Sequence, residues 1–197
     1  MMSSSTRWTR LVTAAIGMSC AIVTIAHAVP ITYTMRGVAS GSLGATGFSG
    51  ATFAVTVVAD TAAMNSLGPG IPCIDPKQAT FTLSDLGTGS ITTPISVADN
   101  AAWQLVALVR GRCVESGPMW TNGRNPDLGS YDLATELPPM VLEMPSAPLG
   151  IVVETSRGML VFESVSALTF EANLKNDAAA TVPGAATAPP DTVNGRA

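Results

Sequence analysis

Histidine is the residue whose absence most limits the chemistry open to this chain. The only histidine is His27, and it lies in an N-terminal stretch that we expect to be removed. Without histidine, the usual general base of Ser/His/Asp and Cys/His catalysis is missing, as is the commonest protein zinc ligand. The lysines Lys77 and Lys175 do not stand at a recognisable spacing from a serine that they could activate. These classes of enzyme and metal site are therefore not predicted.

Carboxylates leave one other reaction open, because glycoside hydrolysis needs only a pair of them. The candidates are Asp132, Glu136, Glu143 and Glu154. No short motif singles out a pair, and ordinary surface positions explain all four. Calcium could bind carboxylate and amide oxygens at Asp99, Asn100, Asp127 or Asp132, but no EF-hand or Asp-repeat spacing is present. The sequence predicts no catalytic residue, no metal site and no cofactor.

Two tryptophans could stack on a sugar ring, and their neighbours distinguish them. Trp103 begins the apolar run WQLVALVR, which favours a place in the core. Trp120 lies between Gly117-Pro118 and Asn122-Gly123, in a stretch rich in turn residues. Binding residues concentrate on loops, and an indole offers a broad apolar face. We therefore expect Trp120 to be the residue that contacts a ligand.

The first residues predict export. Arg7 and Arg10 precede an uncharged run from Leu11 to Ile25, and Ala26-His27-Ala28 follows. A basic segment, an apolar segment and a site with small residues at Ala26 and Ala28 are typical of a signal peptide that is cut after residue 28. An uncleaved anchor is the alternative, since the apolar run approaches the length that spans a bilayer. The predicted location is secreted, extracellular or periplasmic.

Cysteine usage agrees with an oxidising compartment. Cys20 lies within the predicted signal peptide, which leaves Cys73 and Cys113 as an even pair. Cysteines of exported proteins are commonly oxidised, so we predict a disulfide between these two. Two unpaired buried thiols are the alternative.

Period-two patterns predict an all-β fold. Apolar residues alternate with threonines from Ile31 to Met35 and from Thr52 to Val57, on either side of a glycine-rich stretch, as in a β-hairpin. Further strands are expected in 79–86, 91–98 and 103–113, and two in 160–174. One apolar face per sheet requires a second layer. We predict a single antiparallel β-sandwich, jelly-roll-like or Ig-like, over 29–174, followed by a disordered Ala/Pro/Thr-rich tail over 175–197.

The net charge of the chain limits the classes of partner that it is predicted to bind. The chain carries −4 at pH 7, and its basic residues do not gather beyond Arg110 and Arg112. Nucleic-acid binding needs a basic patch and is therefore not predicted. No apolar run after the signal peptide approaches membrane length, so no anchor is predicted once the signal is removed.

Three segments resemble one group of proteins. ITYTMRGVASGSLGATGFSGATFAVTVVADTA (31–62), SYDLATELPP (130–139) and TSRGMLVFESVSALTFEANL (155–174) are similar to bacterial exported β-rich proteins of unknown function, many of which carry the PEP-CTERM sorting signal. The resemblance implies export and association with the cell surface or exopolysaccharide, and it supplies no functional residues. The C-terminus departs from the pattern, because Thr181-Val182-Pro183-Gly184 opens a polar tail in place of a hydrophobic helix and basic cluster. A freely secreted protein is the expectation.

Together these patterns predict an exported, non-catalytic β protein that is a matrix or surface component and binds polysaccharide. Two alternatives stay open. One is a carbohydrate-active hydrolase that uses two carboxylates, and the other is a purely structural or adhesive domain. The sequence does not predict an oligomeric state.

Overall fold

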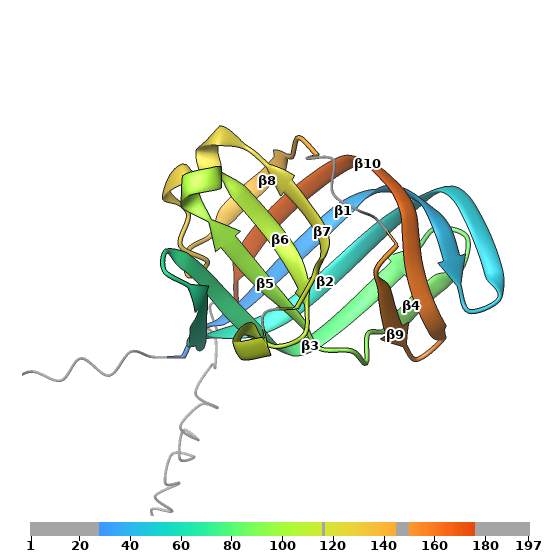
Figure 1. Ribbon diagram of the computed structural model, residues 1–197, viewed down its shortest axis with the longest axis horizontal. Coiled ribbons are helices and arrows are strands. Elements are labelled where there is room, and N and C mark those ends of the chain that lie inside the picture. The colour runs from blue at the N-terminus through green and yellow to red at the C-terminus, as the bar shows by residue number, and fades with distance from the viewer. Residues whose placement is uncertain (1–27, 116, 145–149, 176–197) are drawn as a thin grey trace, which may run out of the picture.

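The predicted opening hairpin is the longest element of the fold. The computed structural model describes residues 28–115, 117–144 and 150–175 (Figure 1), so most of the predicted signal peptide and nearly all of the predicted tail lie outside the described residues. β1 (Pro30–Leu43) pairs antiparallel with β2 (Thr46–Gly68). Gly44, in the turn, has a φ of 59°, which glycine adopts without steric cost. The hairpin prediction is confirmed.

The remaining elements are short except for two strands. They are β3 (Ile71–Leu83), β4 (Gly87–Ser90), β5 (Ile95–Asn100), η1 (Ala101–Trp103), β6 (Leu105–Arg110), η2 (Cys113–Glu115), β7 (Met119–Arg124), η3 (Pro126–Ser130), β8 (Leu137–Val141), β9 (Val152–Thr155) and β10 (Gly158–Leu174). The three η elements are 3-10 helices of five residues or fewer. Within the described ranges, no helix combines the length and the apolar character needed to cross a membrane.

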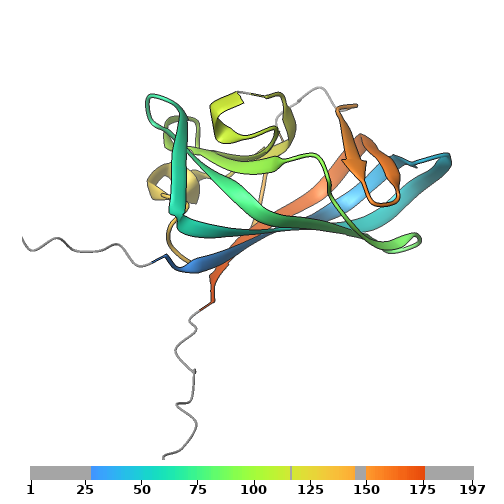
Figure 2. The same cartoon turned by 90° about the horizontal axis from the view of Figure 1, so that it is seen from below.

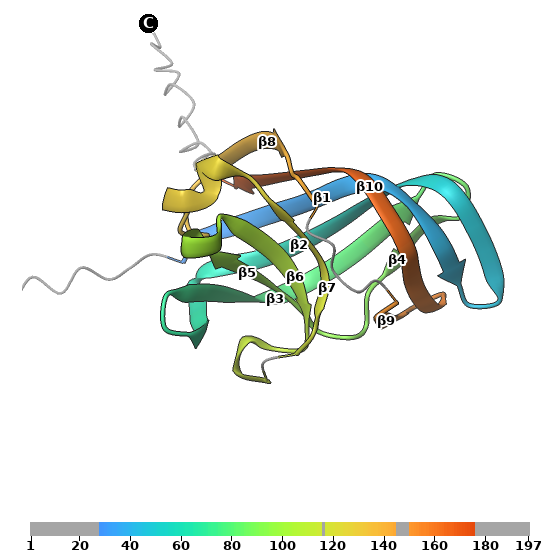
Figure 3. The ribbon, with the colours of Figure 1, turned by 45° about the horizontal axis from the view of Figure 1, so that its top comes forward.

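All ten strands belong to one antiparallel sheet. Its order is β7-β6-β5-β3-β2-β1-β10-β8, with β4 added on β3 and β9 added on β10. The sheet curls into a half-barrel, in which the short strands β5, β6 and β7 stand over the layer formed by the long strands (Figures 2 and 3). Two backbone hydrogen bonds between Arg124 and Glu143, of 2.7 and 2.8 Å, join the segment after β8 to the end of β7. The all-β, antiparallel class is therefore confirmed, with one curled sheet in place of the two expected layers.

Bulges in the long strands explain the curl. The pairing of β1 with β10 shifts register between Arg36 and Val38 and again between Ser40 and Gly41. Bulges bend a strand and increase its twist. At the second shift, a Cβ on Gly41 would lie 1.9 Å from the Val161 carbonyl oxygen, so only glycine allows the two backbones to approach this closely. The residues expected to form two strands in 160–174 instead form the single bent strand β10.

The long strands have different partners at their two ends. β3 pairs with β5 through Cys73 and Ile74, and with β4 through 80–83. β10 pairs with β9 through 158–161 and with β8 through 169–172. The segment after β4 bridges to β9, with Ile91 opposite Thr155. β1, β2, β3 and β10 therefore run through both ends of the molecule.

The core fills the inside of the curl. The inward side chains of the long strands, including Tyr33, Phe53, Phe81 and Phe162, are buried. β5 and β6 are buried on both faces, and their outer side chains, those of Ala98, Leu105, Ala107 and Val109, form a second, smaller cluster with Cys73 and Cys113. The expectation of a central strand in WQLVALVR is confirmed for β6.

Candidate functional site

The two tryptophans occupy the reverse of their expected places. Trp120 is 1% exposed, and its ring stacks on Phe162 with 5.1 Å between centroids and 6° between planes. The register of β7 on β6 shifts between Leu108 and Val109, and this bulge turns Trp120 into the core. Trp120 is therefore not available to a ligand, and the expectation that it contacts one is wrong.

Trp103 is 59% exposed, although the apolar run that it begins predicted burial. The residue lies in η1, the turn between β5 and β6, and not in the strand itself. The Asn100 side chain accepts a hydrogen bond of 3.1 Å from the Trp103 backbone N–H and fixes this turn. Every other aromatic side chain in the described part of the chain is buried. An indole left in water forgoes about 2 kcal/mol of burial free energy, so its position calls for an explanation.

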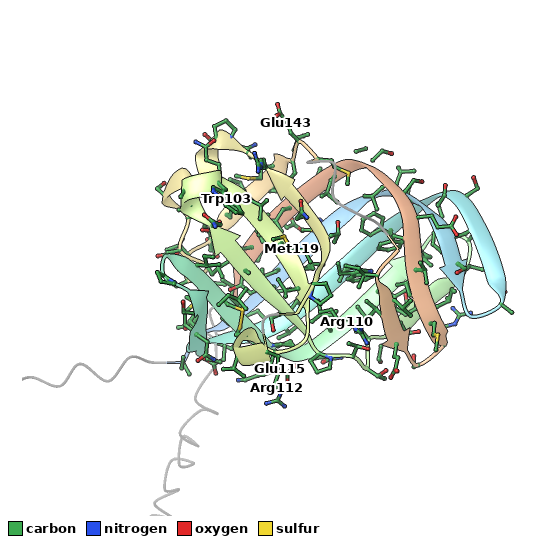
Figure 4. All side chains as sticks on the ribbon, viewed as in Figure 1. Trp103, Arg110, Arg112, Glu115, Met119 and Glu143 are labelled. Carbon is green, nitrogen blue, oxygen red and sulfur yellow. A yellow bond between two sulfur atoms is a disulfide. The ribbon has the colours of Figure 1, made fainter. Side chains whose placement is uncertain are left out.

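A hollow of about 160 Å³ adjoins Trp103 on the outer face of β5 and β6. We call it the Trp103 hollow. Its floor is made of small and aliphatic side chains, those of Ala98, Leu105, Ala107 and Val109. Leu67 and Ile71, from the β2–β3 hairpin, line one side, and Met119 of β7 lines the other. Trp103 and Met119 lie over the same face of the molecule in Figure 4. The two residues of the disulfide belong to the same buried cluster as this floor.

A disulfide joins two residues of the buried cluster that forms this floor. Cys73 of β3 and Cys113 of η2 are bonded, with 5.7 Å between their Cα atoms, and both side chains are fully buried. Cys73 lies opposite Ala98 in the sheet. The predicted pairing of these cysteines is therefore present, and it ties η2 to the strand beside the hollow.

One polar group beside the hollow has no partner. Asn122 lies opposite Ala107 in the register of β7 on β6, which places it on the same outer face as the hollow floor. Its amide nitrogen lies 3.6 Å from the Met119 sulfur, whereas its amide oxygen is buried and accepts no hydrogen bond from the described residues. A buried acceptor without a donor is unfavourable.

The predicted carboxylates do not gather. Glu136, Glu143 and Glu154 are exposed. Glu154 lies on β9, which pairs with the first residues of β10, whereas Glu143 follows β8, which pairs with residues near the end of β10. These two carboxylates therefore lie at opposite ends of β10. Asp132 is also exposed, and its Oδ1 accepts hydrogen bonds from Ala134 N, Thr135 N and Thr135 Oγ1, so it stabilises its own turn. The described ranges contain no group of three His, Cys, Asp or Glu positioned for a metal ion.

Asp99 differs from the other acidic residues because it points into the core. Asp99 lies on the same inward face of β5 as Ile95 and Val97, and it is fully buried. Neither of its carboxylate oxygens has a hydrogen-bond partner among the described residues. Burial raises its pKa to about 7, and the charge of Asp132 adds to the effect. Tyr33 and Tyr131 lie nearby, and burial also raises the pKa of both phenols.

The polar face of the opening hairpin is a second exposed surface that could bind a ligand. It carries an open hollow lined in part by Arg36, Thr52 and Thr82. Arg36 is already ion-paired with Glu171, and no exposed aromatic ring lies there. This face therefore offers hydroxyl groups without a stacking platform, and the Trp103 hollow is the stronger candidate site.

No protein-family model matches this chain, and no curated protein or solved structure is significantly similar to it.

Proposed function

We propose that this protein is an exported, non-catalytic binding component of the extracellular matrix or cell surface, and that it binds polysaccharide at the Trp103 hollow. The observation that carries the proposal is the exposed indole of Trp103 beside an apolar hollow, in a chain whose other described aromatic rings are buried. Export is supported by the N-terminal sequence pattern and is compatible with the disulfide.

The chemistry of a sugar ring fits both parts of this site. One face of a pyranose presents C–H groups that pack on an indole, and its edge presents hydroxyl groups. The hollow supplies aliphatic side chains beside Trp103, and Asn100, which also lines it, supplies an amide group. A purely apolar ligand would use only the former.

Replacing Trp103 tests the proposal. We expect Trp103→Ala to weaken binding to the producing cell's exopolysaccharide by about tenfold or more, because stacking on a broad aromatic face is lost. Binding is measured by affinity electrophoresis of the purified protein, and by quenching of the exposed indole. The free energy of unfolding should change by less than about 0.5 kcal/mol, because Trp103 is a surface residue.

A matched control and a second readout make the result decisive. Met159→Ala removes another large exposed side chain, 58% exposed, from β10 at the far end of the sheet, and should leave affinity unchanged. Equal binding by wild type and Trp103→Ala would refute this site. Release of new reducing ends in the same tube would instead support the hydrolase alternative.

A further inference from the structure

The Trp103 hollow is one of three hollows that adjoin in a row. A second, of about 320 Å³, lies across the Gly117–Pro118 segment and is lined by Arg110 and Glu115. Gly117 lines both hollows. A third, of about 220 Å³, lies across the Thr93–Pro94 segment and is lined by Gln78 and Arg112. Thr93 and Pro94 line both the second and the third. The labelled side chains run from Trp103 past Met119 and Arg110 to Arg112 in Figure 4.

The third hollow exists because β4 and β5 diverge. β3 pairs with β5 at Ile74 and with β4 from Thr80 onward. Between Ile74 and Thr80, residues 75–79 of β3 pair with neither β4 nor β5. Residues 91–95 pass beside this gap in the sheet. The hollow is therefore a feature of the sheet topology and does not depend on the conformation of one side chain.

The row is polar beyond Trp103, and its charges balance. Arg110 and Arg112 are exposed, and neither takes part in an ion pair within the described ranges, where the pairs are Arg36–Glu171 and Lys77–Asp60. Glu115 and Asp75 bring two negative charges to the same hollows. Asp75 Oδ1 accepts hydrogen bonds from Ser96 Oγ and Cys113 N. Lys77 also lines the third hollow and is paired with Asp60, so the charges along the row balance.

We propose that the three hollows are consecutive subsites for one linear, neutral polysaccharide. The inference rests on the proposed function and adds the length and charge class of the ligand. One sugar ring stacks at Trp103, and the hydroxyl groups of the following rings accept hydrogen bonds from Arg110 and Arg112 and donate one to Glu115. β6, with six residues, extends about 20 Å from the Trp103 end of the first hollow to Arg110 in the second. That distance exceeds one ring, so a polymer is required to occupy the row.

Chain length is the variable that tests this inference. The probes are the cello-, malto- and chito-oligosaccharide series, each from one ring to six, titrated against the full protein by calorimetry. In the series that binds, affinity should rise at least about tenfold between one ring and four, because each added ring contributes hydrogen bonds. It should change less than about twofold between low and high salt, because a neutral ligand is not screened.

Variants separate the subsites. The double variant Arg110→Ala/Arg112→Ala should bind a single ring as wild type does, yet lose the gain with chain length. Arg157→Ala, at the turn between β9 and β10, removes the same kind of charge outside the row and should keep the gain. Trp103→Ala should weaken every length alike.

Three results would overturn the inference. They are an affinity that does not depend on chain length, an unchanged length dependence in the double variant, and no binding by any of the three series. If Trp103-dependent binding were found only for acidic polymers such as polygalacturonate, the proposed function would stand and the neutral subsites would be wrong.

Discussion

The free energy of unfolding should fall by about 3–4 kcal/mol as the pH rises from about 4 to 8, and the Asp99→Asn variant should not show this fall. In the unfolded chain, an aspartate titrates near 3.9. In the folded protein, burial without a hydrogen-bond partner raises the Asp99 pKa to about 7. Between these two pKa values the folded state binds one more proton than the unfolded state. The stabilisation that Asp99 contributes is therefore fully present below pH 4 and is lost as the pH rises through 7.

Other acidic groups contribute in a different pH window. The hydrogen bond from Lys77 lowers the Asp60 pKa. The stabilisation that Asp60 contributes is therefore lost only when the pH falls below the usual pKa of an aspartate. Tyr33 and Tyr131, which lie near Asp99, have pKa values raised by burial and stay neutral up to alkaline pH. A fall in stability between pH 5 and 8 is therefore assigned to Asp99.

Urea unfolding followed by tryptophan fluorescence at a series of pH values measures this effect. Asp99→Asn keeps the size of the side chain without a charge, so its stability should stay nearly constant over the same range and exceed that of wild type at pH 8. Asp85→Asn is the control, because Asp85 is exposed in the turn before β4, and it should follow the wild-type curve. A flat wild-type curve would contradict the prediction.

Removing the disulfide should have an effect of similar size. Cys73 and Cys113 are separated by 40 residues, and closing a loop of that length stabilises the folded state by about 4 kcal/mol in the chain-entropy model. The double variant Cys73→Ala/Cys113→Ala should therefore unfold at a markedly lower urea concentration than wild type. Wild type kept in reductant should behave in the same way.

The disulfide also makes a prediction about the site. Because Cys73 and Cys113 share a buried cluster with Ala98, Leu105 and Val109, the double variant should weaken polysaccharide binding even where it remains folded. Mass spectrometry of the exported protein gives an independent check, since two free thiols in the native protein would contradict the bond. A loss of stability below about 1 kcal/mol would contradict its structural role.

Local patterns were sufficient to predict several of the strands, because alternation is a property of adjacent residues, but they did not predict β7 (Met119–Arg124), whose turn residues indicated a loop. The hairpin of β1 and β2 and the central strand β6 were found in this way. The curl of the sheet was not predicted, since it depends on bulges such as the one beside Gly41, and these arise from pairing between β1 and the distant β10. The disulfide pairing followed from an even number of cysteines after the signal peptide.

The site was not predicted, for two physical reasons. A 3-10 turn held by Asn100 places Trp103 outside β6, and a bulge in β7 turns Trp120 inward. Both are irregularities that a period-two pattern does not contain. In addition, Leu67 and Met119 meet across the hollow only because β3 borders β5 and β7 borders β6. Asp99 could have been found, because it continues the inward alternation of Ile95 and Val97.

The continuity of β1, β2, β3 and β10 has a consequence for cooperativity. At one end the outer two of these strands, β3 and β10, pair with β5 and β8, and at the other end they pair with β4 and β9. If either end opened, the same strands would expose apolar side chains along part of their length while still paired at the other end. That partly opened state is unfavourable. We therefore expect a perturbation at the disulfide to be felt at the β9–β10 turn.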